Sequence, residues 1–235
     1  MMNLYHRFLA VITSLICLGV VCGCERPQDT AEFPKVDRLT SGIFLEPETR
    51  FVLPPDVELR KVIDRGLEIT KQSEGFRPRL YNDAADYCTI AYGHLVKLAS
   101  CDGSEPEKFR NGVTIPEGTE LLRTDMEKAE LAVMMLTDVE LSDAQYAALC
   151  DFVYNVGSGN YRSSTLRKVI NAGKHEQVPF QLRRWVKAGG RELPGLVTRR
   201  EDEIKLYFDG SPIPRAAPSA GENVSPIDIR SGEGS

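Results

Sequence analysis

The sequence predicts an α+β domain over residues 56–208, with a small β-sheet lobe and a larger helical lobe. Three observations support this fold class. Apolar residues recur at helical spacing before residue 75, aromatic and β-branched residues replace that pattern over 76–94, and helix-start signals follow from residue 114. With 235 residues, 42% of them apolar, the chain can build one sizeable core with appendages.

A first helix is expected soon after residue 56. Its apolar side chains fit one helical face: Val57, Leu59, Val62, Ile63, Leu67 and Ile69. Gly75 is suited to end this helix, which places Glu74 just past its last turn. Residues 76–94 are expected to form a β-hairpin sheet around the turn sequence NDAAD.

Three capping boxes predict where later helices begin. The sequence TIPE at 114–117 opens a long helix and has a proline just inside the helix start. The sequence SDAQ at 142–145 opens a second helix, which is expected to stop at Gly157. The sequence TRRE at 198–201 is the third box and predicts the start of the last helix.

Both ends of the chain are expected to lie outside the compact domain. Residues 9–23 are an uncharged run of about fifteen apolar or small residues, typical of a signal-peptide core and rather short for a membrane span. We therefore assign residues 1–24 to a signal peptide. Residues 25–55 contain five prolines and 209–235 are rich in Pro, Gly and Ser, so these segments predict a tether and a disordered tail.

The signal ends in Val21, Cys22, Gly23 and Cys24, which resembles the lipobox of bacterial lipoproteins. A lipobox predicts cleavage after Gly23 and lipidation of Cys24. Ordinary secretion and an uncleaved signal anchor remain open as alternatives. All three interpretations place the domain outside the cytoplasm, either in the periplasm or anchored to the membrane.

Charge and ligand chemistry narrow the function classes. The net charge of −5 argues against a general nucleic-acid binder, which needs a clustered basic surface. Residues 151–208 carry an excess of Lys and Arg, which either steers an anionic polymer to one side or forms a solvated helix face. Three scattered histidines and no paired cysteine spacing supply no metal-ligand set, so neither a metal nor a cofactor is expected.

Two carboxylates and a hydroxyl lie close together in the sequence between the first helix and the sheet. Glycosidic cleavage needs one protonated carboxyl and one ionised carboxylate. Glu74, at the end of an apolar helix, is placed for the neutral form, and Asp83, in a polar turn, for the ionised form. Thr89 supplies a hydroxyl suited to holding a water beside Asp83. By residue type alone, all three are also common structural choices.

The spacing of these residues, ending in the sequence TIAYGH, resembles the active-site stretch of the phage lysozymes or endolysins, glycoside hydrolase family 24. The stretches FVYNVGSGNYRSSTLRKVIN and QLRRWVKAGGRELPGLVTRRE are similar to the carboxyl-terminal half of lambdoid-phage endolysins. The resemblance covers about residues 57–208. It implies a lysozyme-like, two-lobed domain whose lobes are joined by a long helix, here 115–137, with substrate in the groove between them.

The resemblance also implies an activity and a set of roles. The substrate would be peptidoglycan, cut at the β-1,4 bond between N-acetylmuramic acid and N-acetylglucosamine. Glu74 would be the general acid, Asp83 the second carboxylate and Thr89 its partner in handling water. Arg199 matches a family arginine that approaches the catalytic glutamate, with a surface arginine as the alternative. Asn155 would line the cleft, with helix capping as the alternative.

Other residues are expected to serve the structure. His94 is expected to be a satisfied hydrogen-bond partner, and Trp185 is expected in the helical core rather than as a sugar platform. Ala91 replaces the glycine that the family segment more often has, so the backbone there is expected to differ slightly.

The cysteines of the domain predict a disulfide in an exported chain. Cys88 and Cys101 flank the sheet segment thirteen positions apart, and a bond between them would close a short loop. Cys150, within a helix, is expected to be a buried free thiol. Three unpaired buried cysteines are the alternative.

Two other functions remain open. A lytic transglycosylase cuts the same bond without water and needs no second carboxylate, so Asp83 and Thr89 argue against it. A non-catalytic peptidoglycan-binding lipoprotein would have no need for Glu74. The muramidase interpretation is preferred, and we expect a monomer whose partner is peptidoglycan.

Overall fold

The computed structural model describes residues 51–218 and 220–233. The expected signal peptide, the lipobox with Cys24 and most of the expected tether lie outside these residues. Within the described ranges, none of the helices combines the length and the apolar character that a membrane span requires.

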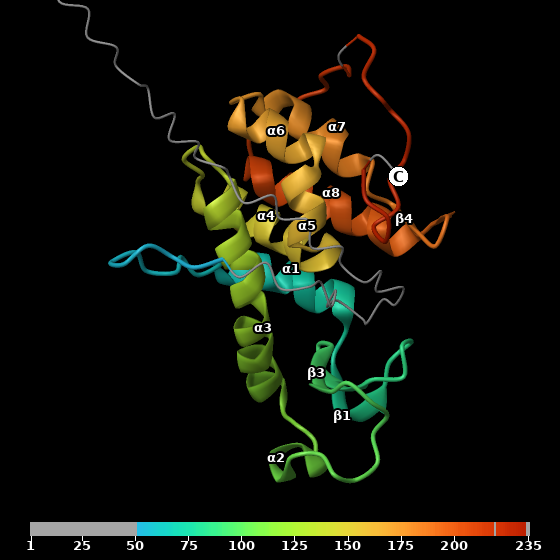
Figure 1. The fold of residues 1–235 in the computed structure, drawn as a ribbon. Coiled ribbons are helices and arrows are strands. Elements are labelled where there is room, and N and C mark those ends of the chain that lie inside the picture. Colours follow the sequence, from blue (N-terminus) through green and yellow to red (C-terminus); the bar gives the residue numbers. More distant parts are fainter. Residues whose placement is uncertain (1–50, 219, 234–235) are drawn as a thin grey trace, which may run out of the picture. The chain divides into compact units, whose positions relative to one another are not determined.

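Helices and one small sheet make up the described chain, which confirms the α+β prediction (Figure 1). The first half contains α1 (Asp64–Glu74), β1 (Arg77–Asn82), β2 (Cys88–Ala91), β3 (His94–Lys97), α2 (Glu107–Arg110) and α3 (Ile115–Leu136). The second half contains α4 (Asp143–Val156), α5 (Ser158–Ser163), α6 (Thr165–Asn171), the 3-10 helix η1 (His175–Gln177), α7 (Val178–Arg183), β4 (Lys187–Ala188), β5 (Arg191–Glu192) and α8 (Pro194–Phe208).

The sheet lobe, defined as β1 to β3 with α2, is built on an antiparallel sheet in the order β1-β2-β3. Thr89 of β2 faces Tyr81 of β1 and Leu95 of β3 in the register. All four residues of β2 are buried, which fits its position between two strands. A bulge interrupts the pairing of β1 with β2 between Arg77 and Tyr81.

Ala91 and Gly118 allow the sheet and α3 to approach closely. Ala91 has a φ of 58°, in the left-handed region that glycine adopts most easily, although this residue carries a methyl group. A Cβ added at Gly118 would lie 3.0 Å from the Ala91 Cβ and 2.7 Å from the Phe76 ring. Only glycine therefore fits on α3 at this contact.

The long helix α3 runs from the sheet lobe to the helical lobe, which we define as α1 and α4 to α8 (Figure 1). It starts at the expected capping box, where Thr114 accepts from the Glu117 backbone N–H and the Glu117 side chain accepts from Thr114. It packs on β2, β3, α4 and α5, so it connects both lobes. His94 of β3 contacts Asp125 of α3 through Nδ1 at 2.9 Å, which confirms the structural role expected for this histidine.

The core of the helical lobe surrounds α4. Every residue of this helix except Asp143 and Gln145 is buried, and α4 packs against α1, α3 and α8. Trp185 is fully buried just after α7, with its ring edge-on to Phe152 of α4 at 5.4 Å. Its prediction as core is confirmed. Cys150 is a buried free thiol, also as expected.

Two helix starts differ from the expected positions. The first helix begins at Asp64, because the preceding backbone is extended and bonds to α3: the Val62 N–H donates to the Glu130 carboxylate at 2.7 Å. The last helix begins at Pro194, four residues before the predicted capping box at Thr198. Proline suits the first helical turn, because a backbone N–H at that position would have no acceptor within the helix.

Residues 222–233 do not form the disordered tail expected for 209–235. Ile227 and Ile229 are buried in the core of the helical lobe, and Asp228 pairs with Lys187 of β4 in a parallel bridge. The Glu233 carboxylate accepts from the buried Arg184 side chain and from the Thr165 backbone N–H at the start of α6. We call residues 222–233 the carboxyl-terminal strap.

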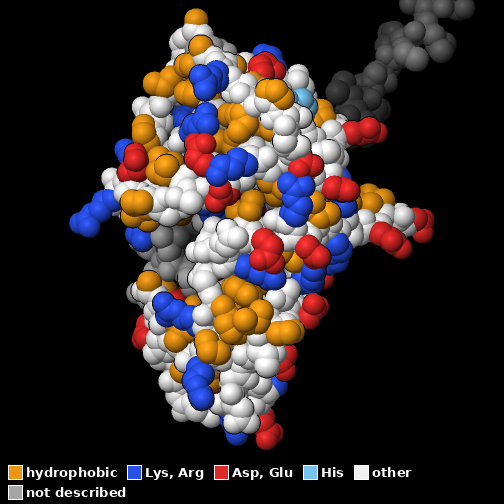
Figure 2. All heavy atoms as spheres, turned by 180° about the vertical axis from the view of Figure 1, so that it is seen from behind, with side chains coloured by type: hydrophobic (Ala, Val, Ile, Leu, Met, Phe, Trp, Pro, Cys, Tyr) orange, Lys and Arg blue, Asp and Glu red, His pale blue; other side chains and the backbone are white. Residues whose placement is uncertain are grey.

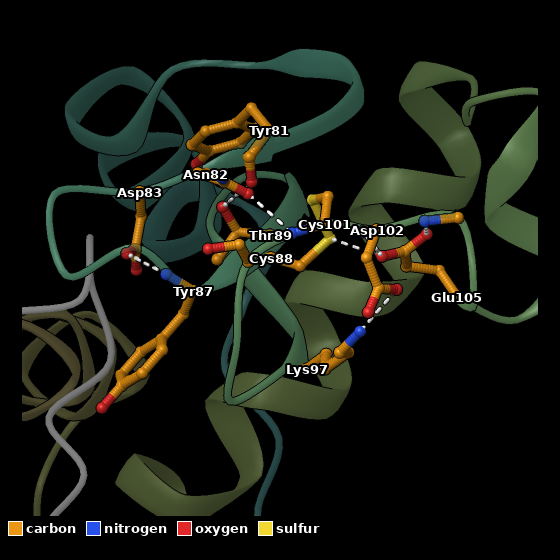
Figure 3. The surroundings of a disulfide bond; sticks show 12 residues. Tyr81, Asn82, Asp83, Tyr87, Cys88, Thr89, Lys97, Cys101, Asp102 and Glu105 are labelled. Atoms are coloured by element: carbon orange, nitrogen blue, oxygen red, sulfur yellow. Dashed lines mark hydrogen bonds and ion pairs between the residues drawn. A yellow bond between two sulfur atoms is a disulfide. The ribbon is translucent and has the colours of Figure 1, made fainter.

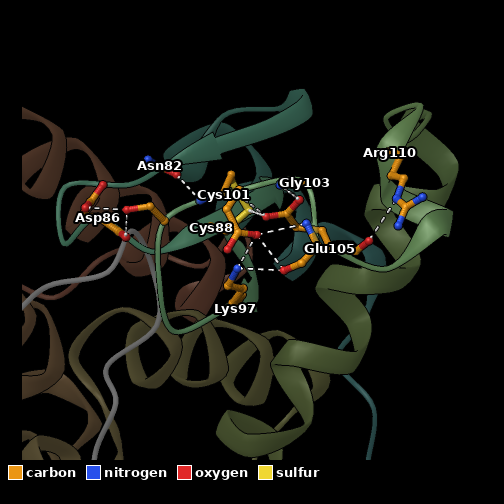
Figure 4. Close-up of polar contacts among 11 residues, drawn as sticks. Asn82, Asp86, Cys88, Lys97, Cys101, Gly103, Glu105 and Arg110 are labelled. Carbon is orange, nitrogen blue, oxygen red and sulfur yellow. Dashed lines mark hydrogen bonds and ion pairs between the residues drawn. A yellow bond between two sulfur atoms is a disulfide. The ribbon is translucent and has the colours of Figure 1, made fainter.

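A disulfide joins Cys88 of β2 to Cys101 of the following loop, with their Cα atoms 4.8 Å apart (Figure 3). The loop is also held by side chains: Asn82 accepts from the Cys101 N–H at 2.8 Å (Figure 4). Glu105 accepts from the backbone N–H groups of Asp102 and Gly103. These N–H groups hold the pKa of Glu105 below its ordinary value.

Removing the strap is expected to destabilise the domain. A chain ending at residue 221 would lose the burial of Ile227 and Ile229 and leave the buried Arg184 without Glu233, so its free energy of unfolding should fall by about 3 kcal/mol or more. Urea unfolding checks this. Val224→Ala, at an exposed position of the same strap, is the control and should change stability by less than about 0.5 kcal/mol. Equal stability of the truncated and full chains would contradict the prediction.

Breaking the disulfide is expected to cost about 3 kcal/mol, because the bond closes a loop with a sequence separation of 13. The variant Cys88→Ala/Cys101→Ala should unfold at correspondingly lower urea concentration. Reductant should bring the wild-type chain to a similar stability and leave the variant unchanged. If reductant destabilised both chains equally, the effect would not come from this bond.

Candidate active site

Glu74 is the last residue of α1, directly before Gly75, whose φ of 70° ends the helix. Its carboxylate is 7% exposed and accepts a hydrogen bond from Nη1 of Arg199 at 2.8 Å. Burial raises the pKa of Glu74 above its ordinary value, the Arg199 guanidinium opposes this, and the nearby Asp151 carboxylate adds to the rise. The environment therefore favours a protonated carboxyl.

Arg199, on α8, joins three helices. Its Nε and Nη2 each donate to the carboxylate of Asp151 on α4 at 2.9 Å, while Nη1 reaches Glu74 on α1. Thr70, one turn before Glu74, donates to the same Asp151 carboxylate at 2.6 Å. From the sequence, contact between Arg199 and Glu74 was expected only because of the family resemblance. In the structure the two side chains form a hydrogen bond.

A second layer of buried polar groups lies behind this arrangement. Arg200 donates to Asn155 at 2.5 Å, lies 3.1 Å from Glu203 and stacks over the Phe152 ring at 4.9 Å. Burial raises the pKa of Glu203 well above its ordinary value, although Arg200 opposes the rise. Burial thus favours the protonated form of the Glu203 carboxyl.

Asn155 is the second-last residue of α4, whose capping residue is Gly157, and its side chain bonds to Arg200 instead of capping the helix. Its side-chain oxygen faces inward to Arg200, and the residue is 8% exposed. In the described residues Asn155 thus supports the buried arginine. A role in lining a substrate cleft stays a prediction.

Asp83 lies in the turn between β1 and β2, where its carboxylate shapes the turn. Its Oδ1 accepts from the backbone N–H groups of Ala85 and Tyr87 at 2.8 and 2.9 Å (Figure 3). Its Oδ2 is buried and accepts no hydrogen bond from the described residues. The turn thus fixes one carboxylate oxygen and leaves the other without a donor from the described residues.

Thr89 is fully buried on β2, and its hydroxyl donates to the Tyr81 carbonyl at 3.3 Å (Figure 3). No hydrogen bond joins Thr89 to Asp83 among the described residues, although both lie in the β1–β2 hairpin. The hydroxyl keeps an acceptor lone pair after this donation. Its predicted part in water handling stays a prediction.

Part of the excess of Lys and Arg in residues 151–208 is buried inside the helical lobe. Arg184, Arg199 and Arg200 are buried and paired with acidic groups, so they add little to the surface field. Figure 2 shows Lys and Arg interspersed with Asp and Glu over the face that it presents. The exposed part of the basic excess is therefore smaller than the sequence count indicates.

The structure offers little for a metal ion. Among the described residues, the one group of His, Cys, Asp or Glu side chains close enough to share an ion is Cys88, Cys101 and Glu105. Both sulfurs of this group belong to the disulfide. The thiolates that a metal would require are therefore not available.

Sequence reasoning missed Asp151, Thr70 and Glu203. Asp151 is a lone acid in the apolar stretch AALCDFVY, four positions before Asn155, and Glu203 is four positions after Arg199. Residues four apart share a helix face. Two sequence signals therefore indicate a buried ionic cluster. One is the acid Asp151 on the buried face of a helix, and the other is the pair Arg199 and Glu203 on one face of another helix.

Comparison with known proteins agrees with this geometry. The phage lysozyme family matches residues 71–203, which include Glu74, Asp83, Thr89 and Arg199. The chain is 34% identical to the endolysin of Bacillus phage B103 over 148 residues, covering 62% of this chain and 53% of that protein. The chain therefore spans about half the length of that relative.

Two further proteins are similar over most of their own length. The SAR-endolysin of Bacteriophage PS119 is 38% identical over 137 residues, covering 58% of this chain and 77% of that one. The muramidase domain of SpmX from Asticaccaulis excentricus superposes with a TM-score of 0.54 at 27% identity, covering 63% of this chain and 97% of that domain. From the family match over more than half of its residues, the chain belongs to the phage lysozyme family.

Proposed function

We propose that the chain is a muramidase that hydrolyses the β-1,4 bond between N-acetylmuramic acid and N-acetylglucosamine in peptidoglycan. The observation that carries the proposal is the buried Glu74 carboxyl, held by Arg199 in surroundings that favour its protonated form. The names of the similar proteins, endolysin and muramidase domain, support it.

In the proposed reaction, Glu74 donates its proton to the glycosidic oxygen as the bond to the leaving sugar breaks. Asp83 accepts a proton from the attacking water through Oδ2, the oxygen that has no hydrogen-bond donor among the described residues. Thr89 orients that water. Arg199 holds the Glu74 carboxylate after the proton has left, so the charge that develops there meets a cation already in place.

This division of roles predicts inversion at the anomeric carbon, because water attacks from the face opposite the leaving group. Lytic transglycosylation is the second candidate, since it also needs one acid. The fixed turn carboxylate of Asp83 favours hydrolysis. Product analysis separates the two, because a muramidase leaves reducing muramic ends and a transglycosylase leaves anhydro ends.

The place of action is proposed outside the cytoplasm, in contact with the cell wall. The similarity to SAR-endolysins supports export of the domain. A signal anchor, a lipid on Cys24 and secretion without an anchor remain the three ways in which the exported domain is delivered. Glu74, Asp83, Thr89 and Arg199 all come from one chain, so the proposed site needs no second copy and a monomer suffices.

Substituting the two carboxylates is expected to abolish activity. Glu74→Gln and Asp83→Asn should each lower turbidity loss of isolated cell walls by about a hundredfold or more, because each removes a proton-transfer group. Matched controls are Glu68→Gln, exposed on the same helix, and Asp86→Asn, exposed in the same turn. Both should stay within about twofold of wild type. Substantial hydrolysis by purified Glu74→Gln would refute the assignment of the acid.

The raised pKa of Glu74 predicts two pH effects. Activity requires the protonated form, so kcat/KM should begin to fall with rising pH only above the range of an ordinary glutamate. The native state also holds this proton more tightly than the unfolded chain, so its contribution to stability is present below the unfolded pKa and is lost as pH rises through the folded pKa.

The amide of Glu74→Gln does not titrate, so this variant does not lose stability as pH rises through the pKa of Glu74. Its free energy of unfolding should equal or exceed that of wild type near neutral pH. Urea unfolding of both chains from about pH 4 to pH 8 checks this, and it also shows that the inactive variant is folded. A variant that loses stability relative to wild type as pH rises would contradict the sign.

A further inference from the structure

Asp151 is a buried carboxylate that the proposed mechanism does not use. It is fully buried on α4, inside the helical lobe, where an unpaired charge would be costly. Its carboxylate accepts close hydrogen bonds from Nε and Nη2 of Arg199, both at 2.9 Å, and from the Thr70 hydroxyl at 2.6 Å. Burial raises the pKa of Asp151, but Arg199 outweighs burial and holds it below its ordinary value, so Asp151 is ionised.

The geometry of Arg199 makes this pair relevant to Glu74. A guanidinium is a planar, rigid fork, so fixing two of its nitrogens fixes the third. Asp151 takes Nε and Nη2, and Nη1 then lies 2.8 Å from the Glu74 carboxylate. The position of the arginine at the proposed acid is therefore set from α4, through Asp151.

The positive charge of Arg199 acts on both carboxyl groups, Asp151 and Glu74. The titratable and charged groups around Glu74 are Arg199 from α8 and Asp151 and Tyr154 from α4. Those around Asp151 are Arg199, Arg200 and Glu203 from α8, Cys150 and Tyr154 from α4, and Glu74 from α1. Without the Asp151 carboxylate, Arg199 would present its whole charge to Glu74 and favour the ionised carboxylate, which cannot donate a proton.

We propose that Asp151 is a positioning residue of the glycosidase site: it orients Arg199 toward Glu74 and offsets the charge of the arginine, so that Glu74 keeps its proton. The expected effect of Asp151 on activity rests on the proposed muramidase function. Its expected effect on the titration of Glu74 in the folded chain does not depend on that function.

The test compares Asp151→Asn with wild type by two measurements. Carbon-13 NMR of labelled glutamate side chains follows the titration of Glu74, which is assigned by its loss in Glu74→Gln. The pH profile of kcat/KM on isolated cell walls follows the consequence. In Asp151→Asn, Glu74 should titrate at lower pH than in wild type, and activity should fall by about fivefold or more on the alkaline side of the profile and much less on the acidic side.

Glu203→Gln is the matched control. Glu203 is as buried as Asp151 and lies beside the same two arginines, at 3.8 Å from Arg199 and 3.1 Å from Arg200, but burial raises the pKa of its carboxyl well above the ordinary value, whereas the pKa of Asp151 is lowered. Replacing it with a neutral amide should leave the Glu74 titration where it is in wild type. A purely structural role for Asp151 predicts an unchanged Glu74 titration in Asp151→Asn as well, and that result would overturn the proposal.

If Asp151→Asn does not fold, the double variant Asp151→Asn/Arg199→Gln keeps the proposal falsifiable, because it removes a charge pair without changing the net charge. Its Glu74 should titrate at lower pH than in Arg199→Gln alone, because the double variant also lacks the Asp151 carboxylate, which raises the pKa of Glu74. An equal Glu74 titration in these two variants would mean that Asp151 contributes nothing to this charge balance, which overturns the proposal. An inactive wild-type chain would refute the proposed function and leave the titration result standing.

Discussion

The buried guanidinium of Arg199 is the interaction on which the arrangement of the helical lobe depends. It ties the end of α1 to the middle of α4 and the start of α8, three helices that are far apart in the sequence. The pairing spans 125 residues between Glu74 and Arg199, so it forms only when the lobe is assembled. The fold and the proposed site therefore depend on the same side chain.

Burying so many ionisable groups is costly, and the chain limits the cost by pairing. Asp151 satisfies two nitrogens of Arg199 and is itself satisfied by Thr70. The second layer is less complete, because Nε and Nη1 of Arg200 donate to no acceptor among the described residues, although the guanidinium lies over the Phe152 ring. The best-satisfied groups are thus the ones that contact Glu74, where geometry matters for proton transfer.

The sequence alone predicted the elements whose signals are local. The capping box at Thr114 fixes the start of α3, and the turn residues around Asp83 fix the hairpin. The extended stretch before Asp64 could not be predicted, because its backbone bonds to Glu130 on α3, a contact across 68 residues. Glu74 and Asp83 were found by chemistry and family likeness. Asp151 was missed because a single acid in an apolar helix gives no local sign of its partner on α8.

The strap completes the helical lobe with contacts between distant parts of the chain. Arg184 and Glu233 are 49 residues apart, and Ile227 and Ile229 enter a core that α4 and its neighbours build. Contacts of this kind stabilise the fold only after the loop between them has closed, so they are expected to form late. The strap should therefore slow unfolding of the domain more than it speeds its folding.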